Sequence, residues 1–178
     1  AQGGAGVSGN NDNGGVGGIY GEGGTGVTTV SGNLTVLGTS YDDIHFDVYN
    51  TTTFSGTSTT WGGDFILHNY GTGAGNSTTI SGHVDAGGAV EITQYLSPNN
   101  NSPIVISGQV HAYGSDVVIS NLGASLGNST TISGDVAAYN GGVAITNLGQ
   151  LTGMLDTTNG TIYADTLAAL TSSGDAKI

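Results

Sequence analysis

The tripeptide apolar-Ser-Gly returns along this chain of 178 residues at a nearly constant interval, and no other feature restricts the fold as much. Successive copies begin about 26 residues apart, and self-similarity at a fixed period of this length is typical of solenoids and other repeat architectures. The five copies are Val30-Ser31-Gly32, Phe54-Ser55-Gly56, Ile80-Ser81-Gly82, Ile106-Ser107-Gly108 and Ile132-Ser133-Gly134.

The repeat extends beyond the tripeptide, and apolar and polar residues alternate within it. In the third copy, residues 78, 80, 82, 84 and 86 would share one face, which predicts a half-buried strand over 78–86 and a second around 90–93. Only residues 164–171 have helical spacing, enough for a single turn. Two further columns recur, a valine two residues after the glycine (Val84, Val110 and Val136) and a later asparagine (Asn69, Asn121 and Asn147).

Strands at a constant period fit either an antiparallel sandwich or a parallel β-solenoid. A solenoid places equal residues of successive coils above one another, so that side chains form ladders, whereas a sandwich gains nothing from such identity. Glycine also suits the corners, because a positive φ costs it nothing. We therefore predict an all-β, parallel β-solenoid (a β-helix or β-arcade) with a coil of about 26 residues, in which the tripeptide, valine and asparagine columns are the structural ladder.

The expected organisation has three parts, a Gly-rich N-terminal segment (1–26), the solenoid repeats (27–162) and a C-terminal tail or cap (163–178). Natural solenoids usually cap their ends with polar or helical elements, and both terminal segments are poor caps. The N-terminal segment alone contains twelve glycines. We therefore predict that the ends pair with other copies in a head-to-tail, non-closing contact, which gives a homo-oligomer or polymer in the form of a filament or tube.

Charge excludes several classes of partner. The chain has 13 acidic residues and a single base, Lys177, for a formal net charge of −12. Nucleic acid requires clustered Lys and Arg, and no apolar run approaches the length of a membrane-spanning helix, so we expect neither nucleic-acid binding nor membrane insertion. The scarcity of trypsin sites, and a start at Ala1-Gln2 like that of a processed chain, predict a secreted or cell-surface protein.

The histidines (His45, His68, His83 and His111) are the candidates for metal binding or catalysis. His83 and Asp85 would share the outer face of one coil, with His111 above Asp85 on the next, but the following coil does not continue the pattern. We interpret them as a solvated surface pair. Serines occur throughout as repeat residues, so no catalytic arrangement stands out, and we expect no enzyme, no metal and no cofactor.

Asn-x-Ser/Thr sequences make several asparagines candidate glycan acceptors in a secreted protein. The competing interpretation is an internal asparagine ladder at a coil corner, and the sequence leaves both open. The candidates are Asn33, Asn50, Asn76, Asn128 and Asn159.

Thr-x-Ser pairs recur on the outward side of the repeat, at residues 29/31, 53/55, 79/81 and 131/133. Stacked coils would turn them into two ranks of hydroxyl groups about 7 Å apart that repeat every ~4.8 Å. This resembles the flat threonine faces of β-solenoid ice-binding proteins, although Val105 interrupts the threonine rank. Ice binding is therefore an alternative function.

The Ile-Ser-Gly-x-Val unit followed by Gly-x-Val-x-Ile, over residues 27–150, resembles the β-strand repeats of large secreted adhesins of the filamentous-haemagglutinin type. Composition and the lack of caps make the chain similar to the β-arcade proteins of the tubular sheaths of methanogenic archaea. These resemblances imply a self-assembling extracellular sheath, filament or surface-fibre subunit. An adhesin stalk or binding module is the other alternative.

Overall fold

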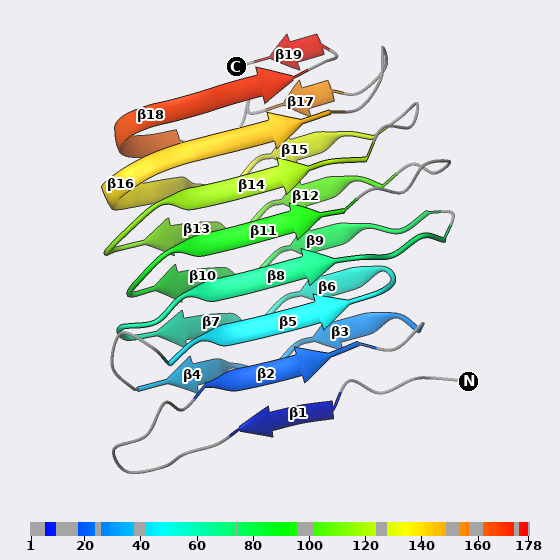
Figure 1. Cartoon of the computed structure of the whole chain (residues 1–178), viewed down its shortest axis with the longest axis vertical. Helices are drawn as coiled ribbons and strands as arrows, with labels where there is room; N and C mark the ends of the chain where they lie inside the picture. Colours follow the sequence, from blue (N-terminus) through cyan, green and yellow to red (C-terminus); the bar gives the residue numbers. More distant parts are fainter. Residues whose placement is uncertain are drawn as a thin grey trace.

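The computed structural model describes residues 18–23, 26–37, 42–73, 75–95, 102–123 and 128–148, together with the strand backbones of 6–9, 154–156, 162–172 and 175–177. Every regular element in these residues is a β-strand, and the strands stack into a parallel β-solenoid (Figure 1). The predicted fold class is therefore confirmed.

Four successive coils contain three strands each. Among the described strands, neighbours from one coil to the next pair in parallel. The coils are β3 (Thr28–Val30), β4 (Leu34–Val36) and β5 (Ile44–Val48); β6 (Thr52–Phe54), β7 (Thr57–Thr60) and β8 (Phe65–Asn69); β9 (Thr78–Ile80), β10 (His83–Ala86) and β11 (Val90–Gln94); and β12 (Ile104–Ile106), β13 (Gln109–Ala112) and β14 (Val117–Asn121).

These strands form three faces, which we call the first face (β2, β5, β8, β11 and β14), the second face (β4, β7, β10 and β13) and the third face (β3, β6, β9, β12, β15, β17 and β19). β16 joins the first two faces, since its residues 136–138 pair with β13 and 143–147 with β14. The remaining strands are β1 (Gly6–Gly9), β2 (Ile19–Glu22), β15 (Thr130–Ile132), β16 (Val136–Asn147), β17 (Met154–Asp156), β18 (Ile162–Ser172) and β19 (Asp175–Lys177).

One period of the sequence repeat corresponds to one coil. Ile80 is in register with Ile106, and Ile106 with Ile132. Along each strand every second side chain faces inward, and these side chains fill the interior. Near β5, β6 and β8 the interior contains Phe46 and Phe65, whose ring centroids lie 5.0 and 5.7 Å from that of Phe54 in edge-to-face contact. Such pairs add to the stabilisation that burial of the rings supplies.

Two local predictions are wrong. The strand expected over 78–86 is two strands, because the chain turns a corner at Ser81-Gly82 between the third and second faces. The alternation survives the corner, so Ile80 and Val84 both remain buried. The helical turn expected near 164–171 is part of β18, whose backbone pairs with β16 and therefore adopts the extended form of its neighbour.

Most of residues 1–26, and all side chains of 163–178, lie outside the described residues. The division into three segments therefore stays a prediction. At the N-terminal end β1 pairs with β2, in antiparallel orientation.

Candidate functional sites: stacked columns and exposed faces

The Ser-Gly corner brings successive coils into very close backbone contact. The amide groups of Ser107 and Gly108 both donate to the carbonyl oxygen of Ile80, at 2.9 and 3.1 Å. A β-carbon placed on Gly108 would overlap the carbonyl oxygen of Gly82, and equivalent overlaps with the preceding coil occur at Gly56, Gly82 and Gly134. Contact between coils, rather than backbone conformation, explains the glycine, since among the described residues only Gly75 has a positive φ.

The predicted ladder residues fall into two groups, one that faces the interior of the coil and one that faces solvent. The isoleucine column (Ile80, Ile106, Ile132) and the valine column (Val84, Val110, Val136) are at most 1% exposed and face the interior. The serines of the tripeptide (Ser31, Ser55, Ser81, Ser107, Ser133) have exposed side chains outside the corner. The inward columns therefore carry the packing and the serines border solvent.

The asparagine column is a buried polar ladder at the end of the first face. Asn121 donates from its side-chain amide to the carbonyl oxygens of Ser102 and Ser129, at 2.8 and 3.0 Å. Asn69 donates in the same way to the carbonyl of Asn50, at 2.9 Å. Asn147 is in register with Asn121 and is fully buried. The side-chain amides of Asn69 and Asn121 satisfy backbone carbonyls where the chain leaves the sheet, and a buried carbonyl without a partner would cost free energy.

Gln94 also belongs to this column, and the sequence did not predict it because glutamine replaces the recurring asparagine. It stands in register between Asn69 and Asn121, and its side-chain oxygen accepts a hydrogen bond from the Thr78 hydroxyl at 2.8 Å. Its position before Tyr95, like that of Asn69 before Tyr70, is the signal that could have identified it.

The candidate glycan acceptors have different environments. The side chains of Asn76 and Asn128 are buried at the corner before the third face, where a glycan has no room in the folded coil. Asn128 accepts a hydrogen bond from the amide of Ser102, one coil away, at 2.7 Å. Asn50 is half-buried, Asn33 is exposed, and Asn159 lies outside the described residues. For Asn76 and Asn128 burial favours the internal-ladder interpretation.

The outward hydroxyl groups of the third face form the two expected ranks. Thr29, Thr53, Thr79, Val105 and Thr131 occupy one column in register across β3, β6, β9, β12 and β15. The serines of the tripeptide form the rank beside it. Val105 leaves one gap in the threonine rank.

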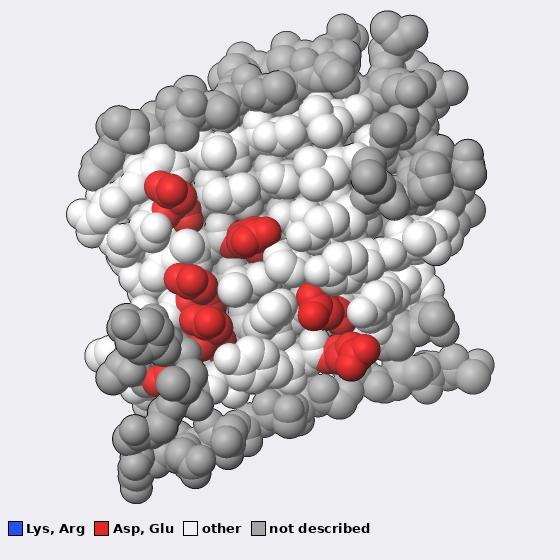
Figure 2. All heavy atoms as spheres, viewed as in Figure 1, with Lys and Arg blue, Asp and Glu red and all other residues white. Residues whose placement is uncertain are grey.

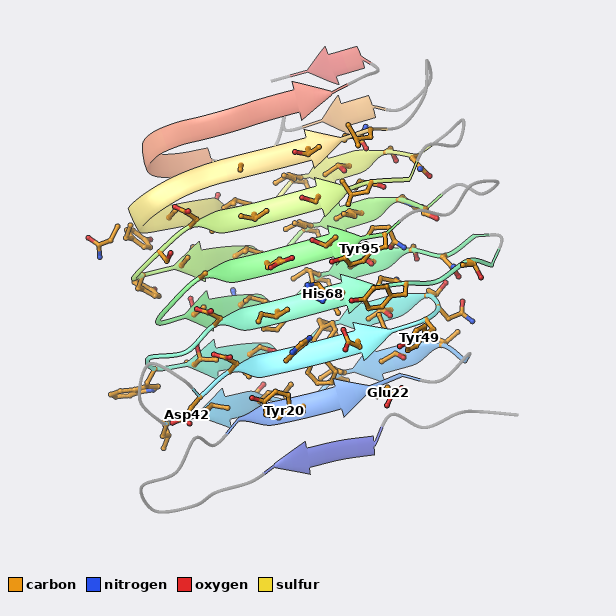
Figure 3. All side chains as sticks on the ribbon, viewed as in Figure 1. Tyr20, Glu22, Asp42, Tyr49, His68 and Tyr95 are labelled. Carbon is orange, nitrogen blue, oxygen red and sulfur yellow. The ribbon has the colours of Figure 1, made fainter. Side chains whose placement is uncertain are left out.

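The first face carries a cluster of histidine and carboxylate side chains that the repeat did not predict. His45 and Asp47 on β5 lie beside His68 on β8, and Glu91 on β11 lies beyond His68. Asp47 Oδ1 is 3.3 Å from His45 Nε2 and 3.4 Å from His68 Nδ1. Figure 3 shows His68 near the middle of this face. The side chains of His45, Asp47 and His68 are each only partly exposed.

A tyrosine stack borders this cluster. Tyr49, Tyr70 and Tyr95 follow β5, β8 and β11 in turn, and Figure 3 labels Tyr49 and Tyr95. The ring of Tyr70 stacks on both, and it is parallel to that of Tyr95 within 9° with centroids 4.5 Å apart. Desolvation raises the pKa of the Tyr70 hydroxyl above its ordinary value, and the negative charge of Asp47 adds to the shift. The Tyr70 hydroxyl therefore stays neutral at ordinary pH.

The second face has the surface pair expected from the sequence. His111 lies in register with Asp85, and its Nδ1 is 3.1 Å from Asp85 Oδ1. His83 is exposed and does not join them. Tyr113 and Tyr139 stack beside His111 with centroids 5.0 Å apart.

No described residue lies in a helix that could span a lipid bilayer. Comparison of the chain with known proteins gives no match to any family model, to any curated protein or to any solved structure. The resemblances to adhesin repeats and sheath proteins therefore depend on the repeat and the composition alone.

Proposed function

We propose that the protein is a self-assembling extracellular structural protein, a sheath, filament or surface-fibre subunit in which the sheets of one copy continue into the next. The observation that carries the proposal is that β3 and β4 are edge strands. Among the described strands, β3 pairs only with β6, and β4 only with β7. An edge strand of this kind is a template for pairing with another chain.

The backbone of these strands has hydrogen-bonding groups directed away from the coil. The Thr28 amide donates to the Thr51 carbonyl, and the Val30 carbonyl accepts from Ser55, so both residues are bonded toward β6. Because bonding direction alternates along a strand, the amide and carbonyl of Thr29 face the open side. The same argument applies to Thr35 on β4, since the Val36 carbonyl accepts from Trp61 on the β7 side.

The edges lack the devices that usually prevent strand addition. Natural edge strands carry charged residues, proline or bulges, whereas the residues of β3 and β4 are Thr-Thr-Val and Leu-Thr-Val. Figure 2 shows acidic side chains in small separate groups on the first face, with no Lys or Arg among the described residues in this view. Stacked backbone hydrogen bonds would then carry load along the fibre, while the side-chain ladders keep the register.

Purified full-length chain is expected to form fibres or tubes by electron microscopy, and species larger than monomer by light scattering, with a fraction that rises with concentration. The double variant Thr29→Pro/Thr35→Pro should stay monomeric, because proline removes the two outward amide donors and leaves the bonds to β6 and β7 intact. Thr29→Val/Thr35→Val is the matched control, since it keeps both donors. A monomeric wild type, or unchanged assembly of the proline variant, would contradict the proposal.

Ice binding is a second candidate, favoured by the hydroxyl ranks of the third face. Thermal hysteresis of the purified protein separates the two functions. For a structural subunit we expect none, because the threonine rank is interrupted at Val105 and its serine neighbour lacks methyl groups. Hysteresis in the wild type that disappears in Thr79→Lys, with assembly unchanged, would instead assign the third face to ice.

A further inference from the structure

We propose that His45, Asp47 and His68 bind one divalent transition-metal ion of the zinc class, which clips adjacent coils together on the first face. Among the described residues this is a group of three ligand-type side chains whose coordinating atoms all lie within 4.8 Å of one another. The inference is independent of self-assembly, because all three ligands come from one chain.

The distances within the group fit a tetrahedral ion. Bonds of about 2.0–2.1 Å place neighbouring ligand atoms of a tetrahedron roughly 3.3–3.4 Å apart. Asp47 Oδ1 is 3.3 Å from His45 Nε2 and 3.4 Å from His68 Nδ1. The carboxylate oxygen therefore already lies at the correct distance from both imidazole nitrogens. The two imidazole nitrogens, which lie within 4.8 Å of each other, need only move closer together.

The strands supply this arrangement. His45 and Asp47 are two residues apart on β5 and so project to the same side, while Asp47 is directly opposite His68 in the parallel ladder. The rings of His45 and His68 are nearly perpendicular, at 82°, with centroids 5.4 Å apart. Both rings rest on rigid sheet, where ligands are held more accurately than on a loop.

The position of Glu91 independently supports His68 Nδ1 as the ligand atom. His68 Nε2 lies 3.0 Å from Glu91 Oε1, and a carboxylate accepts hydrogen bonds, so Nε2 would donate its proton to Glu91 when Nδ1 binds the metal. That leaves Nδ1 to face Asp47. A carboxylate that holds the far nitrogen of a histidine is the usual support of a metal-binding imidazole. The Thr93 hydroxyl in turn donates to Glu91 at 3.2 Å.

The Tyr70 hydroxyl also lies 3.3 Å from His68 Nδ1 and would lose this contact when a metal binds. The fourth ligand position is left to water, since Asp47 and His45 are 38% and 29% exposed. Two imidazoles and one carboxylate are ligands that Zn²⁺, Co²⁺, Ni²⁺ and Cu²⁺ accept, in contrast to the all-oxygen sites of Ca²⁺ and Mg²⁺.

The test is calorimetric titration of the chelator-treated full-length chain with Zn²⁺, repeated with Co²⁺, whose visible absorption reports tetrahedral coordination. We expect one ion per chain. His45→Gln and His68→Gln should each weaken binding by at least about tenfold, and Glu91→Gln by about tenfold through loss of the support to His68. Tyr70→Phe should bind as tightly as the wild type or more tightly.

His111→Gln is the matched control, because His111 has an aspartate partner but belongs to no group of three ligands in the described chain. It should bind Zn²⁺ as the wild type does. Zn²⁺ should raise the thermal unfolding midpoint of the wild type and of His111→Gln, but not of the His45→Gln/His68→Gln double variant. Absence of Zn²⁺ binding at micromolar concentrations, or equal binding by the double variant and the wild type, would overturn the proposal.

Discussion

Val110→Asp is expected to destabilise the protein by at least about 4 kcal/mol, enough to unfold the coils around it. Val110 is 0% exposed and lies between Val84 and Val136 in the interior valine column. A carboxylate there loses its hydration without gaining a cationic partner. The change in the free energy of unfolding can be measured by urea denaturation followed by far-ultraviolet circular dichroism.

The control is Ser107→Asp, which adds the same charge slightly earlier in the same coil, on an exposed side chain. Its effect should stay within about 0.5 kcal/mol. The loss in Val110→Asp should also be smaller at acid pH. Burial raises the pKa of the new carboxyl in the folded state, so its protonated form is favoured there and stability falls as pH rises. Equal stability of the two variants at neutral pH would show that residue 110 is not inside the coil.

Gly108→Ala should destabilise the protein by about 2–3 kcal/mol, a large effect for a single methyl group. The new β-carbon would meet the carbonyl oxygen of Gly82 in the coil before, which is backbone and has no free rotation. The coils would have to separate at this corner, where the Gly108 amide bonds to Ile80 at 3.1 Å. Thermal and urea unfolding both report the change.

Gly32→Ala provides a matched comparison at the same position of the tripeptide. A β-carbon on Gly32 has no heavy atom within 4 Å. Neither glycine has a positive φ, so alanine is strained at neither, and in the unassembled chain, where no second copy covers β3 and β4, Gly32→Ala should be neutral or stabilising by about 0.5 kcal/mol through the unfolded state. If both variants lost stability equally, backbone conformation and not the contact between coils would explain why glycine recurs in the motif.

The fold was predictable from the sequence because several ladder columns, such as Ile80, Ile106 and Ile132, repeat the same residue. On the third face a Ser-Gly corner follows each of β6, β9 and β12, and β9, β12 and β15 begin one full period apart, at Thr78, Ile104 and Thr130. The columns can therefore be read directly. The corner itself was not visible, since inward and outward residues continue to alternate across Ser81-Gly82. Nothing in a period-two pattern distinguishes one long strand from two strands at an angle.

The histidine cluster could not be read from the repeat for a related reason. The strands of the first face do not keep a constant spacing, since β5, β8, β11 and β14 begin at Ile44, Phe65, Val90 and Val117. The step from β5 to β8 is shorter than one period. Asp47 and His68 therefore do not share a repeat position, although they are direct neighbours in the ladder. The constant period did succeed for Asp85 and His111, where the second face keeps it.

Length differences of this kind are confined to particular corners. Two residues separate β9 from β10, whereas eight separate β8 from β9 and nine separate β11 from β12. The coil thus has one tightly constrained bend and another that accommodates extra residues while the strands on either side keep their hydrogen bonds. The strand ends that border this wider bend follow one another along the stack at roughly 4.8 Å intervals. Foreign peptides inserted between them would be displayed as a closely spaced linear array, while the apolar interior keeps its packing.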